Sequence, residues 1–265
     1  MTAELTRYRL RHRARPIDVW VAGDGPPIVL LHGWGLSGRV YRDAVLAIAS
    51  RGYRVAAPSL AVAESWKMDM IAEMAAEAMA GVDAAPAPVL GHSFGGAVGV
   101  TLAVQHPDFV RAVVPISAPL VSLGTRGMGK VVLPGRHFRI VTHAPAAAAL
   151  LRAATTRGGI GSLARAARWV IGNGQDPRLE TLAATDIPRA VVWAEEDSLL
   201  SPEVGRRAAE VLACTFHLIG GGNGWNGTRL PDHDWPMRHP EHFADTILRI
   251  LGSLLPADPD YGLHA

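Results

Sequence analysis

The stretch that decides the fold is residues 88–96, which read Pro-Val-Leu-Gly-His-Ser-Phe-Gly-Gly. It joins a short apolar run, typical of a buried strand, to a segment of helical composition. The residues around Ser93 match the pattern G-x-S-x-G at this junction. A chain that turns sharply from strand to helix projects the serine hydroxyl away from the sheet. Side chains at Gly91 and Gly95 would collide in such a turn, so the pattern predicts a nucleophilic serine.

Strand and helix patterns alternate on both sides of this motif. Strands are predicted over 16–21, 28–31, 53–57, 88–91, 111–116, 190–193 and 214–219, and helices over 39–50, 68–79, 93–105, 202–212 and 241–255. Such alternation implies a mostly parallel sheet with helices on both faces. The sequence therefore predicts an α/β fold.

The alternation breaks over residues 120–187, where no clear strand pattern is present. Helical composition is found at 146–154 and 162–171. We therefore expect one core formed by residues 1–119 and 188–265, with 120–187 inserted as a helical cap, or lid.

Composition excludes several classes of protein. The chain has 265 residues, 49% hydrophobic and 19% charged, which is a globular balance. No apolar run reaches the roughly 18 residues of a membrane-spanning helix, and a net charge of +2 without a binding motif gives no reason to expect nucleic acid. Cys214 is the single cysteine, which excludes intramolecular disulfides and cysteine metal sites. We expect no cofactor, no metal and, since no export signal is visible, a cytoplasmic location. Nothing in the sequence specifies an oligomeric state.

Five arginines alternate with other residues near the N-terminus: Arg7, Arg9, Arg11, Arg13 and Arg15. In one extended strand they would share a face, because successive side chains alternate. The favoured interpretation is an edge strand kept soluble by charge. The alternative is a contact for anionic lipid or an acidic partner.

Four segments, spread over nearly the whole chain, resemble the α/β-hydrolase superfamily. They are Leu30–Gly35 (Leu-Leu-His-Gly-Trp-Gly), Gly91–Gly96, Trp193–Asp197, and His233 ahead of Pro240. The residues Trp34-Gly35-Leu36 are similar to those of some small carboxylesterases, including esterases that cleave methyl esters of carrier-bound acids. The resemblance implies the α/β-hydrolase fold and a serine hydrolase with Ser93 as nucleophile.

The superfamily places an acid and then a histidine downstream of the nucleophile. Asp197 follows the predicted strand 190–193 by a short step, at the carboxyl end of the sheet where such sites form. The resemblance therefore assigns the acid to Asp197. Glu195 and Glu196 are its rivals.

The resemblance assigns the catalytic base to His233, which stands seven positions before Pro240. Three other histidines are alternatives. His239 is expected at the start of the last helix, His242 on the polar side of that helix, and His217 inside a strand.

An oxyanion hole needs two backbone N–H groups that face the developing negative charge. The residue after the nucleophile, Phe94, is expected to supply one, and the resemblance assigns the other to Trp34. His32, Gly33, Gly91, His92 and Gly95 complete the two motifs.

Two segments depart from the superfamily pattern. Residues 57–65 lack the aspartate and glycines that many members carry after the second parallel strand. Residues 220–227 form a glycine-rich stretch ahead of His233, interpreted as a tolerated insertion or as a flap that opens with substrate.

The leading functional hypothesis is hydrolysis of a small or medium apolar carboxylic ester through an acyl-enzyme. Acyl transfer, perhydrolysis, thioester hydrolysis and C–C bond hydrolysis remain open, because the same triad serves them all. A non-catalytic ligand-binding protein with this fold is the alternative from another class.

Overall fold

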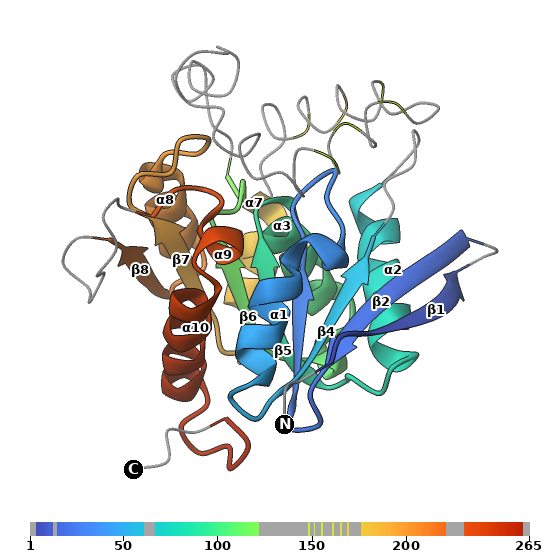
Figure 1. The fold of residues 1–265 in the computed structure, drawn as a ribbon. Helices are drawn as coiled ribbons and strands as arrows, with labels where there is room; N and C mark the ends of the chain where they lie inside the picture. Colours follow the sequence, from blue (N-terminus) through green and yellow to red (C-terminus); the bar gives the residue numbers. More distant parts are fainter. Residues whose placement is uncertain are drawn as a thin grey trace.

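The computed structural model describes residues 4–12, 15–60, 67–121, 176–220 and 231–261, with single residues at 148, 151, 155, 161, 165 and 169. The described residues form an eight-stranded sheet in the order β1-β2-β4-β3-β5-β6-β7-β8 (Figure 1). β1 (Thr6–His12), β2 (Arg15–Ala22) and β4 (Arg54–Ser59) pair antiparallel. The parallel strands that follow are β3 (Pro27–Leu31), β5 (Ala87–His92), β6 (Val110–Ile116), β7 (Ala190–Ala194) and β8 (Thr215–Ile219). The predicted α/β fold with a mostly parallel sheet is confirmed.

Helices cover both faces of the sheet and bury a separate apolar core on each (Figure 1). On one face lie α1 (Arg42–Ala49), the short α9 (Trp235–Arg238) and α10 (Pro240–Leu254). On the other face lie α2 (Met68–Ala80), α3 (Phe94–Gln105), α7 (Asp176–Ala183) and α8 (Pro202–Val211). The central parallel strands β3, β5, β6 and β7 are buried on both sides, which explains why they read as continuous apolar runs, whereas the edge strand β8 is partly exposed.

The helix predicted over 39–50 is two elements, a 3-10 helix η1 (Gly38–Tyr41) followed by α1. Gly38 packs directly against β4: a Cβ at this position would lie 2.0 Å from the Ala57 carbonyl oxygen. Its N–H also donates to Ser59 Oγ at 3.1 Å. This close contact fixes η1 on the sheet and buries the Tyr41 side chain completely beneath it.

The arginine-rich segment divides between two strands. Arg7, Arg9 and Arg11 lie exposed on β1, whereas Arg15 opens β2. The expectation that all the arginines share one strand is therefore wrong. β1 is an edge strand, as expected. Both Arg7 and Arg9 pair with Asp18 on β2, at 2.6 and 3.4 Å.

Most of the segment expected to form the cap lies outside the described residues; within the helices predicted at 146–154 and 162–171, only residues 148, 151, 165 and 169 are described. So does the glycine-rich stretch after Gly220. Helix α7 falls within 120–187, and its Leu179 and Leu182 are fully buried in the core on the α3 side. Among the described helices, none has the length and hydropathy needed to cross a bilayer.

Candidate active site

Ser93 occupies the sharp turn between β5 and α3. Its backbone adopts φ 53° and ψ −124°, a conformation that costs a residue with a side chain about 1–3 kcal/mol. The turn is tight on both sides: a Cβ on Gly91 would lie 2.4 Å from the Gly95 carbonyl oxygen, and one on Gly95 would lie 2.3 Å from that of Leu31. Ser93 is half-buried, whereas His92 and Phe94 beside it are buried. The predicted strand-to-helix turn is therefore present, with its serine accessible.

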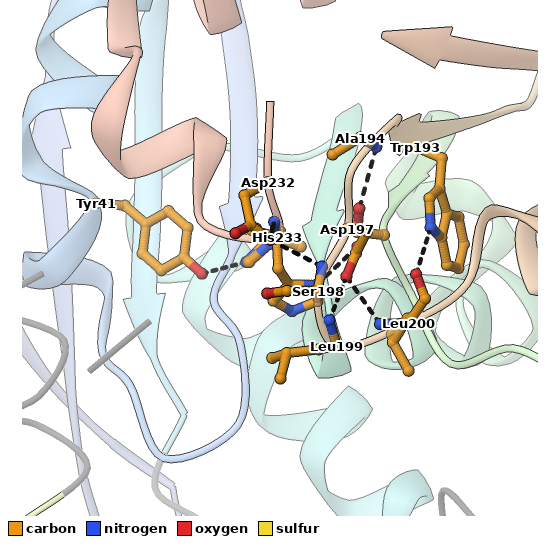
Figure 2. Close-up of polar contacts among 11 residues, drawn as sticks. Tyr41, Trp193, Ala194, Asp197, Ser198, Leu199, Leu200, Asp232 and His233 are labelled. Carbon is orange, nitrogen blue, oxygen red and sulfur yellow. Dashed lines mark hydrogen bonds and ion pairs between the residues drawn. The ribbon is translucent and has the colours of Figure 1, made fainter. Parts of the chain in front are cut away.

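Asp197 and His233 lie together at the carboxyl end of the sheet (Figure 2). The Asp197 Oδ2 atom is 2.9 Å from His233 Nδ1, and both side chains are almost completely buried. The other carboxylate oxygen, Oδ1, accepts the backbone N–H groups of Leu199 and Leu200 at 2.9 and 2.8 Å. The rival acids Glu195 and Glu196 are exposed. Of the three acids, Asp197 is the one that the structure places against His233.

The surroundings of His233 favour its protonated form. Burial works against a charged imidazole, but the Asp197 carboxylate, helped by Asp232 and Asp234, outweighs burial and raises the pKa of His233 above its ordinary value. Because a carboxylate only accepts, Nδ1 carries the proton and donates it to Asp197. Nε2 of the neutral ring is then left as a proton acceptor.

Asp232 connects the two loops that carry Asp197 and His233. Its Oδ1 atom accepts the N–H of Ser198 at 2.8 Å and the N–H of His233 at 2.6 Å. Figure 2 shows this carboxylate between the two segments. The relative position of the acid and the histidine is thus fixed by a third buried side chain.

The other candidate histidines lie elsewhere. His239 is the residue before α10, His242 packs edge-on against Trp235 with ring centroids 5.8 Å apart, and His217 lies within β8. Within the described ranges, no three His, Cys, Asp or Glu side chains gather as a metal-ligand set.

The His32-Gly33-Trp34 turn lies beside Ser93, since a Cβ on Gly33 would lie 3.5 Å from Ser93 Cβ. His32 fixes this turn: its Nε2 accepts the Leu60 N–H at 2.9 Å, so its Nδ1–H donates to the Gly33 carbonyl at 2.8 Å. Burial lowers the pKa of His32 to about 4, so the ring stays neutral. Leu60 belongs to the segment that departs from the superfamily pattern, and here its backbone supports the turn.

Phe94 is the first residue of α3, so its N–H lies at the positive end of the helix dipole. Trp34 is half-buried and packs against the core on the α3 side. The two expected oxyanion donors therefore lie on the two turns that meet beside Ser93.

Sequence reasoning missed two residues and the role of a third. Tyr41 and Asp232 were not singled out, and His92 was named only as part of the motif. All three are buried and polar, with hydrogen bonds to the backbone or side chains of the site. The sequence offered one signal for Asp232: it belongs to a run of three titratable residues, 232–234, directly before Trp235.

A family model described as alpha/beta hydrolase fold matches residues 26–131. The structure also resembles that of an N-acyl homoserine lactonase mutant complexed with N-hexanoyl homoserine, with a TM-score of 0.73, 17% identity, and coverage of 95% of this chain and 98% of that one. The chain therefore has the α/β-hydrolase fold, and its residues 26–131 match the model of that family.

Two curated relatives each match part of this chain. The magnesium-chelatase 30 kDa subunit of Rhodobacter capsulatus is 35% identical over 136 residues, 47% of this chain and 46% of the relative. The pimeloyl-[acyl-carrier protein] methyl ester esterase of Aeromonas hydrophila is 34% identical over 100 residues, 36% of this chain and 39% of the relative. The chain thus matches less than half the length of each. The differing names show that this fold does not determine the activity, which must be argued from the site.

Proposed function

We propose that the protein is a serine hydrolase that cleaves a carboxylic ester through an acyl-enzyme, with Ser93, His233 and Asp197 as its catalytic triad. The observation that carries the proposal is the 2.9 Å bond between His233 Nδ1 and Asp197 Oδ2 at the same end of the sheet as the strained Ser93 turn. A serine hydroxyl is a weak nucleophile until an adjacent base takes its proton.

In the first half of the reaction, Ser93 Oγ attacks the ester carbonyl carbon while His233 Nε2 takes the hydroxyl proton. The C=O π electrons move onto the carbonyl oxygen. Backbone N–H groups of Trp34 and Phe94 stabilise this oxyanion. When the tetrahedral intermediate collapses, the C–O bond to the alcohol breaks and His233 returns its proton to the leaving oxygen.

In the second half, water attacks the acyl-enzyme and loses its proton to the same Nε2 atom. Collapse of the second intermediate returns that proton to Ser93 Oγ and releases the carboxylic acid. Asp197 keeps the ring in the tautomer that accepts at Nε2 and stabilises the imidazolium in both halves. The pKa of His233, raised by Asp197, fits a residue that must carry the proton transiently.

Aromatic side chains beside Ser93 support an apolar acyl or alcohol group in the substrate. Trp169 lies edge-on to Phe94 with ring centroids 5.9 Å apart, and Trp34 packs on the same core. Trp169 belongs to 120–187, which supports a lid role for that segment. The methyl ester esterase and the lactonase among the similar proteins carry names that denote carboxylic ester substrates, the lactone being a cyclic ester.

The test is labelling with a fluorophosphonate probe, mapped by mass spectrometry, together with turnover of p-nitrophenyl acetate, butyrate and octanoate. We expect label on Ser93, and loss of both label and turnover in Ser93→Ala. Ser198→Ala is the matched control, since this half-buried serine lies next to Asp197 and has no part in the proposed reaction. Ester turnover retained by Ser93→Ala refutes the proposal. Methanol or peroxide added to the same assay shows whether water is the preferred acyl acceptor.

A further inference from the structure

A buried chain of hydrogen bonds runs from the oxyanion turn to the backbone of the catalytic histidine. The Gly33 N–H donates to Tyr41 Oη at 3.1 Å, and that hydroxyl lies 2.5 Å from His92 Nδ1. On the other side of the same ring, His92 Nε2 lies 2.8 Å from the His233 carbonyl oxygen. Tyr41 and His92 are both fully buried, and in Figure 2 the Tyr41 hydroxyl points toward the segment of Asp232 and His233.

The two ends of this chain fix where every proton lies. The His233 carbonyl only accepts, so His92 Nε2 must carry a proton and donate it. In a neutral ring, Nδ1 is then an acceptor and takes the single proton of the Tyr41 hydroxyl. That hydroxyl has its oxygen lone pairs left to accept the Gly33 N–H. One arrangement therefore satisfies all three bonds.

The electrostatic surroundings keep His92 in the neutral form that this arrangement needs. Burial, together with repulsion from a protonated His233, lowers the pKa of His92 well below its ordinary value. The two imidazole rings lie with centroids 4.8 Å apart. His92 thus stays neutral when His233 becomes an imidazolium during the reaction.

This series of hydrogen bonds supplies the third of three contacts that position His233. Its ring Nδ1 bonds Asp197, its backbone N–H bonds Asp232, and its backbone carbonyl bonds His92. The third bond also leads through Tyr41 to Gly33, the residue before Trp34.

Resting on the proposed function, we propose that Tyr41 and His92 are positioning residues that tie the oxyanion turn to the catalytic histidine. The link holds the oxyanion donor at Trp34 and the base at His233 in one fixed geometry around Ser93. Tyr41 and His92 are both fully buried, so we expect neither side chain to touch the substrate. An error of about 1 Å in the placement of reacting groups can cost about 100-fold in rate, so a link between these two parts has a direct effect on kcat.

The variants are Tyr41→Phe, which removes the shared hydroxyl, and His92→Leu, which removes both ring nitrogens. We expect kcat for p-nitrophenyl butyrate to fall about 10- to 100-fold in each, with KM within about twofold. His92→Gln retains an amide N–H that can reach the His233 carbonyl, so it should recover part of the loss. Because both variants break one continuous link, the double variant should lose little more than the worse single variant.

Tyr261→Phe is the matched structural control. Tyr261 is also buried, and its hydroxyl donates to the Pro27 carbonyl at 2.6 Å, at the start of β3 and outside the site. It should lower the thermal midpoint about as much as Tyr41→Phe while kcat stays at the wild-type value. If Tyr41→Phe and Tyr261→Phe lower kcat equally, the effect is one of stability and the positioning role is refuted.

An activity-independent readout separates this inference from the proposed function. The imidazole of His233 can be titrated by NMR in Ser93→Ala protein, with Tyr41→Phe or His92→Leu added. A loosened His233 contacts Asp197 less well, so its pKa should fall; Tyr261→Phe should leave it unchanged. An unchanged pKa in both test variants overturns the link, whatever the esterase assays give. Ester turnover retained by Ser93→Ala overturns the proposed function alone.

Discussion

Replacing Asp197 with asparagine is expected to lower kcat about 10⁴-fold while the fold persists. The asparagine oxygen can keep the two backbone bonds to Leu199 and Leu200 that Oδ1 accepts now. Its amide nitrogen then faces His233 Nδ1 in place of Oδ2. Because that amide donates, the ring must accept at Nδ1, and its proton moves to Nε2. A protonated Nε2 on a neutral ring cannot take the proton of Ser93.

The magnitudes separate catalysis from stability. A 10⁴-fold loss corresponds to roughly 5 kcal/mol in activation free energy. For folding, the variant keeps both backbone bonds and exchanges one charge-assisted hydrogen bond for a neutral one, a change of about 1–2 kcal/mol. The kinetic effect should therefore far exceed the change in the free energy of unfolding.

The assay is kcat for p-nitrophenyl butyrate beside urea unfolding of the same preparations. Asp232→Asn is the matched control: this carboxylate is also buried and also accepts two backbone N–H groups, which an asparagine oxygen can accept in turn. It should keep kcat within about tenfold. The reasoning is refuted if Asp197→Asn retains a tenth of the wild-type kcat, or if the two variants lose activity equally.

Four further outcomes are expected. Since the neutral form of His233 acts as base and its pKa is raised, kcat/KM should rise with pH with a midpoint above about 6.5; a lower midpoint contradicts the assignment. Burial lowers the pKa of His32 to about 4, so its contribution to the free energy of unfolding is complete above about pH 6.5, and up to about 3 kcal/mol of it is lost as the pH falls through 4. In urea unfolding at a series of pH values, His32→Asn should show a smaller loss of stability on the acid side. Gly95→Ala places a Cβ 2.3 Å from the Leu31 carbonyl oxygen, so it should unfold at lower temperature and lose fluorophosphonate labelling; a wild-type melting midpoint would count against this packing. Trp169→Ala should raise KM for the octanoate ester several-fold and leave that for acetate within about twofold, and equal effects on both would argue against an acyl contact.

The Ser93 turn was predictable because its cause is local. Glycines on both sides, an apolar strand before and a helix after are all visible within ten residues of sequence, and the structure reproduces them. Asp197 and His233 could not be predicted from local patterns alone, because they are 36 residues apart. They were assigned from the order of serine, acid and histidine that the resemblance supplied. Their exposed rivals Glu195 and Glu196 differ from Asp197 in burial, which composition does not reveal.

The support of the site was not predictable, since it depends on long-range packing. Tyr41 and His92 are 51 positions apart, and His92 and His233 are 141 apart, so no local pattern connects them. Tyr41 also lies at the end of η1, which the helical pattern of 39–50 concealed. The prediction that the N-terminal arginines share one strand was wrong for a similar reason. Their period of two fits a single strand, but a hairpin places Arg15 on the neighbouring strand.

The described side chains that support His233 lie on the sheet, on η1 or in the loops that connect the strands and helices. Tyr41, His92, Asp197 and Asp232 precede or follow residues 122–175, and none lies within them. Under the proposed function, the proton transfers depend on residues outside 122–175, and the expected lid within 120–187 would select the substrate. Under the same proposal, replacing the 122–175 segment with one of another composition would alter which esters are accepted and leave the hydrogen bonds and proton transfers at His233 unchanged. Such a division would let one set of catalytic residues acquire new substrates by exchange of a single internal segment.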